Sequence, residues 1–200
     1  MATMTSDNEV STAKELKVGW TFLSLTRIGL GLVLFWAFLD KTFALGFATG
    51  RDKETGAVDY FGPAAWINGG KPTQGFLKAT SGEFGGEPGG LYGEMFKGWG
   101  DFSLGSFRPL DWLFMLALGG IGLALILGIV TKLAAWANLI LYVFLFIAAF
   151  DNTNNPFIDD HLVYALATVG IVYVELKYQA IGVGKWWRNV ELVKKNGWLV

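Results

Sequence analysis

Four long stretches of apolar residues with few or no charged side chains dominate this chain, and they span residues 18–39, 112–131, 133–150 and 156–178. The second and third stretches contain no Asp, Glu, Lys or Arg, and the first contains only Arg27. A helix of about 20 apolar residues crosses the hydrocarbon core of a bilayer, whereas a soluble helix keeps one polar face. We therefore predict an all-α membrane protein whose four transmembrane helices form a bundle within residues 18–180.

The composition agrees with a membrane protein and narrows its chemistry. Charged residues make up 16% of the chain, well below the roughly 25% of soluble domains, and the net charge of −1 argues against nucleic-acid binding. The chain has no cysteine and one histidine. It therefore supplies no metal site, haem site or iron–sulfur cluster by itself, so any redox chemistry needs a bound cofactor, a substrate quinone or a partner.

Basic residues next to the four stretches gather on one side of the predicted membrane. They are Lys14, Lys17, Lys132, Lys177, Lys185, Arg188, Lys194 and Lys195. The connection 151–155 on the other side has no Lys or Arg. Because Lys and Arg favour the cytoplasmic side, we predict a multi-pass protein of the cell membrane with a cytoplasmic N-terminal tail over 1–17 and a cytoplasmic C-terminal tail over 181–200. The basic and aromatic composition of the second tail is typical of a segment lying on lipid.

The segment 50–109 is predicted to be a long, structured extracytoplasmic loop between the first and second helices. It holds ten aromatic residues, although disordered linkers are poor in aromatics, and a connection of this length usually carries structure or function. We expect short amphipathic or 3₁₀ pieces that cover the outer end of the bundle.

One charged residue lies deep in the first predicted helix. Arg27 is about 13 Å along that helix from residue 18 at 1.5 Å per residue, and charges at such depth are usually functional. Asn138 and Glu175 lie on the same, inner side. Two interpretations stay open: a structural ion pair between Arg27 and Glu175, or binding of a ligand or quinone by Arg27.

A second polar group gathers at the predicted outer ends of the helices. Its members are Asp40, Lys41, Arg108, Asp111, Asn154, Asn155, Asp159, Asp160 and His161. Histidine titrates near neutral pH, so His161 suits proton exchange with a reduced substrate. A structural interpretation is equally open for the two acids before it, because the first turn of a helix favours negative charge.

Small residues recur every fourth position on the second predicted helix, at Gly120, Ala124 and Gly128. Such a stripe lets another helix approach closely. It predicts helix packing within the chain or, alternatively, association with another subunit.

Several motifs resemble one family. The run NNPFIDDHLVYAL at 154–166, the run GKPTQGFL at 70–77, the run DWLFMLALGGIGLALILG at 111–128, and the shorter LTR at 25–27 and DK at 40–41 resemble DoxD-type proteins of the DoxX-like superfamily. These are small membrane subunits of thiosulfate:quinone oxidoreductase. The resemblance extends from about residue 16 to 180, in the same order.

The resemblance implies oxidation of thiosulfate to tetrathionate, transfer of electrons to a quinone that serves as substrate, and a second protein subunit or larger respiratory complex beside the membrane lipid. The matching polar positions become candidates: His161, Asp160, Asp159 and Arg27 for catalysis, and Lys41, Asp40, Arg108, Asp111, Asn155 and Tyr164 for substrate binding. A non-catalytic membrane anchor or accessory subunit of a respiratory assembly is the alternative. A transporter is disfavoured because the second and third stretches carry no charge.

Overall fold

The computed structural model describes residues 2–74, 76–77, 93–148 and 157–200, which form helices and no β-strand. Three described helices are long and apolar enough to cross a membrane: α1 (Ala2–Phe43, over its part Thr12–Phe43), α4 (Pro109–Leu127) and α5 (Thr131–Ala148). The predictions of an all-α chain and of a membrane protein are therefore confirmed for the described residues. The predicted stretches 112–131 and 133–150 correspond to α4 and α5 within a few residues.

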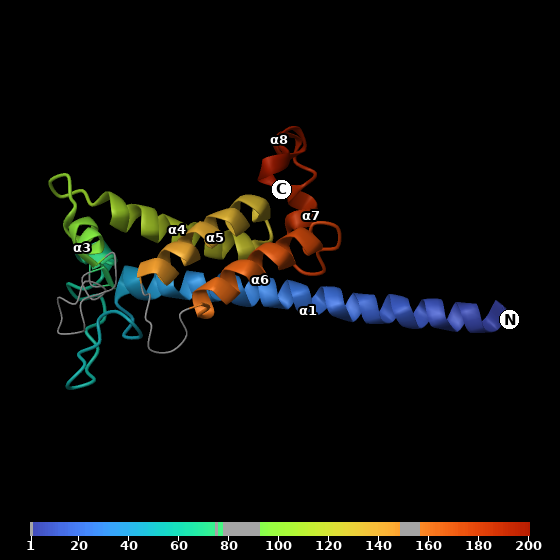
Figure 1. Cartoon of the computed structure of the whole chain (residues 1–200), viewed down its shortest axis with the longest axis horizontal. Helices are drawn as coiled ribbons and strands as arrows, with labels where there is room; N and C mark the ends of the chain where they lie inside the picture. Colours follow the sequence, from blue (N-terminus) through green and yellow to red (C-terminus); the bar gives the residue numbers. More distant parts are fainter. Residues whose placement is uncertain (1, 75, 78–92, 149–156) are drawn as a thin grey trace.

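The first helix is much longer than the predicted span 18–39. α1 begins at Ala2 and continues without interruption to Phe43, so the segment 1–17, predicted as a tail, is helical from residue 2. The reason is local, because residues 2–18 contain no proline or glycine and the run AKELK at 13–17 consists of strong helix formers. In Figure 1 the N-terminal part of α1 projects well beyond the other helices.

The fourth predicted span contains α6 (Asp160–Glu175), a helix of 16 residues. Its length of about 24 Å is less than that of a typical crossing helix. Tyr178, at the end of the predicted stretch, lies in a turn after the helix, where its N–H donates to the Glu175 carbonyl at 3.1 Å. A fourth crossing, and with it a bundle of four transmembrane helices, stays a prediction.

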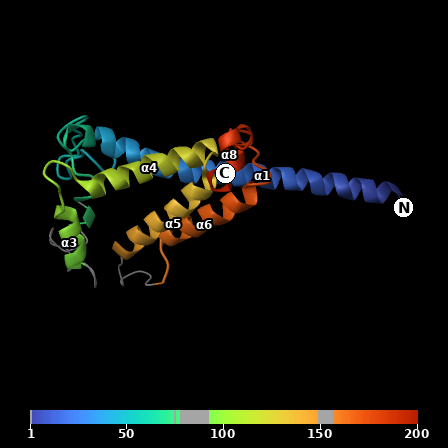
Figure 2. The same ribbon diagram turned by 90° about the horizontal axis from the view of Figure 1, so that it is seen from above.

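The long helices form two pairs. α1 packs most extensively on α4, and α5 packs most extensively on α6. Figure 2 shows that the two pairs meet near the C-terminus and diverge toward the opposite end. We call the end where α4 meets α5 the tail end, and the end near Phe43, Pro109 and Asp160 the loop end.

One apolar core joins the four helices. Its buried members are Leu34, Met115, Leu118, Ile121, Leu125, Ala134, Ala135, Leu141, Tyr142, Ala165 and Val172. Large apolar side chains also face outward, among them Phe22, Leu116, Ile140 and Leu166. Helices that are apolar on both the inner and the outer face fit a lipid environment.

The described part of the loop 50–109 contains short helical pieces, among them η1 (Trp66–Asn68) and α3 (Gly93–Asp101). This confirms the prediction of short helical pieces there. The aromatic rings of Phe96 and Trp99 on α3 lie 5.6 and 6.0 Å from that of Phe144 on α5, so α3 covers the loop end of α5. In another part of the loop, hydrogen bonds from the backbone and side chain of Thr55 and from the backbone of Glu54 hold the pKa of the exposed Asp52 carboxyl below its usual range.

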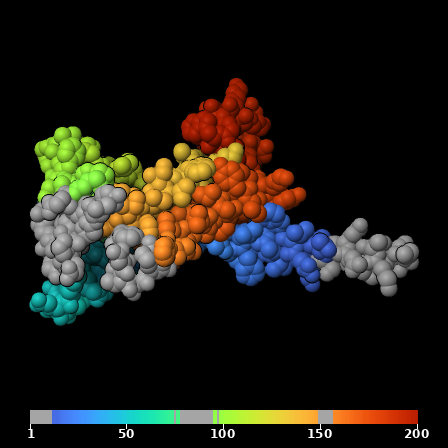
Figure 3. Space-filling model, in the orientation of Figure 1, coloured from blue at the N-terminus to red at the C-terminus, as the bar shows by residue number. Residues whose placement is uncertain are grey.

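The C-terminal residues form a compact unit of three short helices. α7 (Gly184–Trp187), α8 (Glu191–Lys195) and η2 (Gly197–Leu199) fold back toward the α4–α5 connection, where the backbone N–H of Lys132 donates to the Val200 carbonyl at 2.9 Å and its ammonium donates to the Gly197 carbonyl at 2.9 Å. Figure 3 shows this C-terminal cap (red) standing at the tail end of the helices.

Glycines bring α1 and α4 together, but they are not the predicted stripe. A Cβ on Gly122 would lie 2.7 Å from the Phe35 nitrogen, and a Cβ on Gly31 would lie 2.8 Å from the Gly122 oxygen. Gly120 faces open space. Gly128 ends α4 with a left-handed φ of 77° and donates its N–H to the Ala124 carbonyl, so it acts as a helix cap.

Candidate functional site

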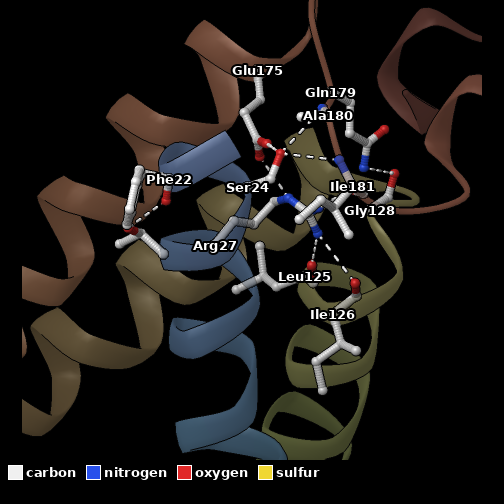
Figure 4. A network of polar contacts seen from close by, with 11 residues as sticks. Phe22, Ser24, Arg27, Leu125, Ile126, Gly128, Glu175, Gln179, Ala180 and Ile181 are labelled. Atoms are coloured by element: carbon white, nitrogen blue, oxygen red, sulfur yellow. Dashed lines mark hydrogen bonds and ion pairs between the residues drawn. The ribbon is translucent and has the colours of Figure 1, made fainter. Parts of the chain in front are cut away.

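A buried network surrounds Arg27 at the tail end of the helices (Figure 4). The Arg27 Nε donates to Glu175 Oε2 at 2.6 Å, and its Nη2 donates to the Ile181 carbonyl at 2.6 Å. Its Nη1 donates to the carbonyls of Leu125 and Ile126 at the end of α4. The Arg27 side chain is 1% exposed and that of Glu175 is 4% exposed. We call this set the inner network.

Neighbouring polar residues complete the inner network. The Ser24 hydroxyl donates to Glu175 and accepts the backbone N–H of Ala180 at 3.1 Å, and Gln179 Nε2 donates to the Gly128 carbonyl at 3.2 Å. The predicted ion pair between Arg27 and Glu175 is therefore confirmed. Because every nitrogen of the Arg27 guanidinium already binds protein atoms, the network joins α1, α4 and the end of α6, and Arg27 has little capacity left for a ligand.

Two of the predicted substrate-binding residues, the partly buried Arg108 and the buried Asp111, form an ion pair at the start of α4. Arg108 Nε donates to Asp111 Oδ2 at 2.7 Å, and Arg108 Nη2 donates to the Gly100 carbonyl at the end of α3. The other Asp111 oxygen accepts the backbone N–H of Thr73 at 3.0 Å and the Thr73 hydroxyl. This carboxylate therefore ties the loop 50–109 to α4 and fixes the direction of the Arg108 side chain.

Asp40 and Lys41 lie in the last turns of α1. The buried Asp40 carboxylate accepts the backbone N–H groups of Phe47 and Ala48 at 3.0 and 2.9 Å. Both of its oxygens are thus used to shape the turn that follows α1. Lys41 is partly buried beside it.

His161, Asp159 and Tyr164 lie at the loop end of α6. His161 Nδ1 lies 2.6 Å from Asp159 Oδ2, with both side chains about one third exposed, and the other Asp159 oxygen caps α6 by accepting the Leu162 N–H at 3.1 Å. The ring of Tyr142 on α5 lies 5.8 Å from the His161 ring and 5.9 Å from the Tyr164 ring. A carboxylate on Nδ1 orients an imidazole so that Nε2 can exchange a proton. Asp160 follows as an exposed residue of the first turn.

The structure does not bring these polar residues into one cluster. Among the described residues, no hydrogen bond or ion pair joins His161 or Asp159 to Arg108, Asp111 or Asp40. The reason is the divergence of the helix pairs toward the loop end (Figure 2), which separates the polar residues of α1 and α4 from those of α6. Asn154 and Asn155 lie outside the described residues.

An open pocket of about 350 Å³ lies at the start of α4. Its lining residues are Trp66, Ile67, Gly69, Gly70, Ser106, Arg108, Asp111 and Trp112. The rings of Trp66 and Trp112 meet edge to face with centroids 4.8 Å apart. We call it the Trp pocket. Its volume lies within the range of small-molecule sites, roughly 300–1,000 Å³.

Sequence reasoning missed several of the residues that build these sites. Trp66 was one of many loop aromatics, and Ser24 is a hydroxyl in an apolar stretch. Thr73 lies within the run GKPTQGFL. The resemblance of this run to the DoxD-type motif draws attention to the segment, but it does not indicate that Thr73 contacts Asp111. Tyr142 stands one helical turn after Asn138, a spacing that places both on one face.

Comparison with known proteins adds no assignment. No family profile matches the chain, and no curated protein or solved structure is detectably similar to it.

Proposed function

We propose that this chain is a membrane subunit of a quinone-linked oxidoreductase and that the Trp pocket receives the quinone head group. The pocket is the observation that carries this proposal. Two indole rings form its walls, and planar uncharged rings pack well against aromatic side chains. In this proposal α6 is the fourth crossing and the loop end faces outward.

The charges of the pocket favour a neutral ligand over an anion. Arg108, the one cation among the described residues that line the pocket, is already compensated by Asp111 at 2.7 Å. A guanidinium has five N–H groups, and its bonds to Asp111 and Gly100 leave others to donate to a quinone carbonyl. Trp112 and Ile67 are 47% and 55% exposed, so the pocket opens beside apolar side chains along which an isoprenoid tail can lie.

Reduction of a quinone to a quinol takes up two electrons and two protons. The resemblance to DoxD-type proteins supplies the electron donor in this proposal, since joining two thiosulfate ions into one tetrathionate releases two electrons. A dianion does not suit the charge-balanced Trp pocket, so we assign the thiosulfate site to a partner subunit. His161, oriented by Asp159 at 2.6 Å, lies with Tyr164 on α6 outside the Trp pocket, so we propose that it exchanges protons with the outer side and does not contact the quinone directly.

Binding of a quinone to the purified chain tests the pocket. A short-chain quinone carrying a photoreactive azido group is expected to label residues of the Trp pocket in lipid-containing detergent. Replacing Trp112 with leucine should weaken quinone binding by about five- to tenfold, because an aromatic contact contributes about 1 kcal/mol beyond buried area. The affinity is measured by competition with unlabelled quinone.

Trp186→Leu provides the matched control, because Trp186 is an exposed tryptophan of α7 far along the chain from the pocket. This variant should bind the quinone as the unchanged protein does. Labelling outside the pocket, or equal affinity in the Trp112→Leu variant, contradicts the proposed site. If the chain binds no quinone but copurifies with a respiratory complex, it is an accessory subunit instead.

A further inference from the structure

Polar residues recur at seven-residue intervals along the facing sides of α5 and α6. On α6 they are His161, Thr168 and Glu175, and on α5 they are Thr131 and Asn138, with Tyr142 one turn further. Seven residues are two helical turns, so each set lies on one face. Asn138, Thr168 and Glu175 are at most 3% exposed. We call these six residues the polar seam.

Contacts between α5 and α6 show which seam residues of the two helices lie opposite each other. At one end, Thr131 and Glu175 line the same small cavity. At the other end, the rings of Tyr142 and His161 lie 5.8 Å apart. Because the two helices are antiparallel neighbours, Asn138 lies at the level of Thr168 between these ends. The seam extends over about 21 Å, since 14 residues separate His161 from Glu175.

Several seam atoms are buried without a hydrogen-bond partner in the described part of the chain. They are Asn138 Nδ2, Asn138 Oδ1 and the Tyr142 hydroxyl. Gln179 Oε1, which lies outside the seam at the tail end, is also buried without a partner. The Thr168 hydroxyl donates to the Tyr164 carbonyl at 2.7 Å and keeps lone pairs to accept. Buried polar groups in a low-dielectric interior are almost always paired, and lipid supplies no partner.

Water is the partner that fits these atoms. The small cavity at the tail end has a volume of about 10 Å³, close to the space that one water molecule needs. Its lining residues are Arg27, Thr131, Val172, Glu175, Leu176, Gln179 and Arg188. Along the axis of α5, Tyr142 lies about 6 Å from Asn138, and Asn138 lies about 10 Å from Thr131. A few hydrogen-bonded water molecules bridge such distances.

We propose that the polar seam holds a file of water molecules between α5 and α6 and that protons pass along it between His161 and the small cavity beside Glu175. A proton binds at His161 Nε2. Each neighbouring water molecule and the Tyr142 hydroxyl then accepts one proton and donates another to the next group. One proton leaves at the tail end, so the number of protons on the protein does not change. The proton gradient sets the direction. This proposal goes beyond the quinone site and does not depend on it.

Proton flux into vesicles tests the seam in the absence of quinone. The full chain is reconstituted in proteoliposomes with a pH-sensitive dye inside, and a potassium diffusion potential with valinomycin drives protons inward. Flux should exceed that of protein-free vesicles. Asn138→Leu should lower this protein-dependent flux by about tenfold, the effect of losing one hydrogen-bonded link of about 1.4 kcal/mol from the barrier.

Two further variants keep the test decisive. Tyr142→Phe removes one hydroxyl and little else, so it should fold and still lower the flux. Tyr173→Phe removes a hydroxyl from the outer side of the same helix pair, where it accepts from Trp136 Nε1 at 3.0 Å, and should leave the flux unchanged. Flux equal to that of empty vesicles, or equal in Tyr142→Phe and the unchanged protein, overturns the proposal whether or not the chain binds quinone.

Discussion

Replacement of Glu175 by alanine is expected to lower the free energy of unfolding by about 3–5 kcal/mol, because it leaves the Arg27 charge buried without its partner. The Arg27 side chain is 1% exposed, and its Nε lies 2.6 Å from Glu175 Oε2. Ser24 loses the acceptor of its hydroxyl as well. Unfolding in mild detergent, followed by circular dichroism, measures the loss.

Glu191→Ala is the matched control for this prediction. Glu191 pairs with Lys194 at 3.0 Å, but their side chains are 77% and 49% exposed, and exposed pairs contribute at most about 1 kcal/mol. The double variant Arg27→Met, Glu175→Leu should recover part of the loss, since an apolar pair often replaces a buried ion pair at little cost. A double variant no more stable than Glu175→Ala would show that the charge imbalance is not the cause.

The Arg27–Glu175 pair was predictable in part because a charge within an apolar helix needs a compensating partner. Glu175 is an acid on the same predicted side of the membrane. The carbonyl partners of Arg27, which belong to Leu125, Ile126 and Ile181, were not predictable. Every residue carries a carbonyl, and only the packing of α1 against α4 decides which ones Arg27 reaches.

The helices α4 and α5 were predictable from the sequence because long stretches without charged residues are suited to the hydrocarbon core of a membrane. The boundary between them did not, since Gly128 was assigned to a packing stripe while it ends α4 in a left-handed conformation. The loop-end residues were assigned correctly to helix ends, but sequence does not encode how far those ends diverge. For that reason Arg108 and His161 were expected in one cluster and lie in separate groups.

Replacement of Gly122 by alanine is expected to destabilise the protein by about 1–3 kcal/mol, the cost of inserting a methyl group where backbones already touch. The added Cβ would lie 2.7 Å from the Phe35 nitrogen and 2.9 Å from the Gly31 oxygen. Because both atoms belong to the α1 backbone, no side-chain rotation relieves the clash. The helices must move apart, which also disturbs the nearby Arg27 contacts to the end of α4.

Matched controls lie two positions away on each helix. Gly120 on α4 and Gly29 on α1 meet nothing within 4 Å, so Gly120→Ala and Gly29→Ala should keep or raise stability by up to about 1 kcal/mol through helix propensity. Gly31→Ala should resemble Gly122→Ala, since its Cβ would lie 2.8 Å from the Gly122 oxygen. Equal unfolding midpoints for Gly120→Ala and Gly122→Ala would mean that α1 and α4 do not meet at these glycines. A loss confined to Gly31 and Gly122 would identify this crossing, rather than the Gly120 stripe, as the close contact that holds α4 in place.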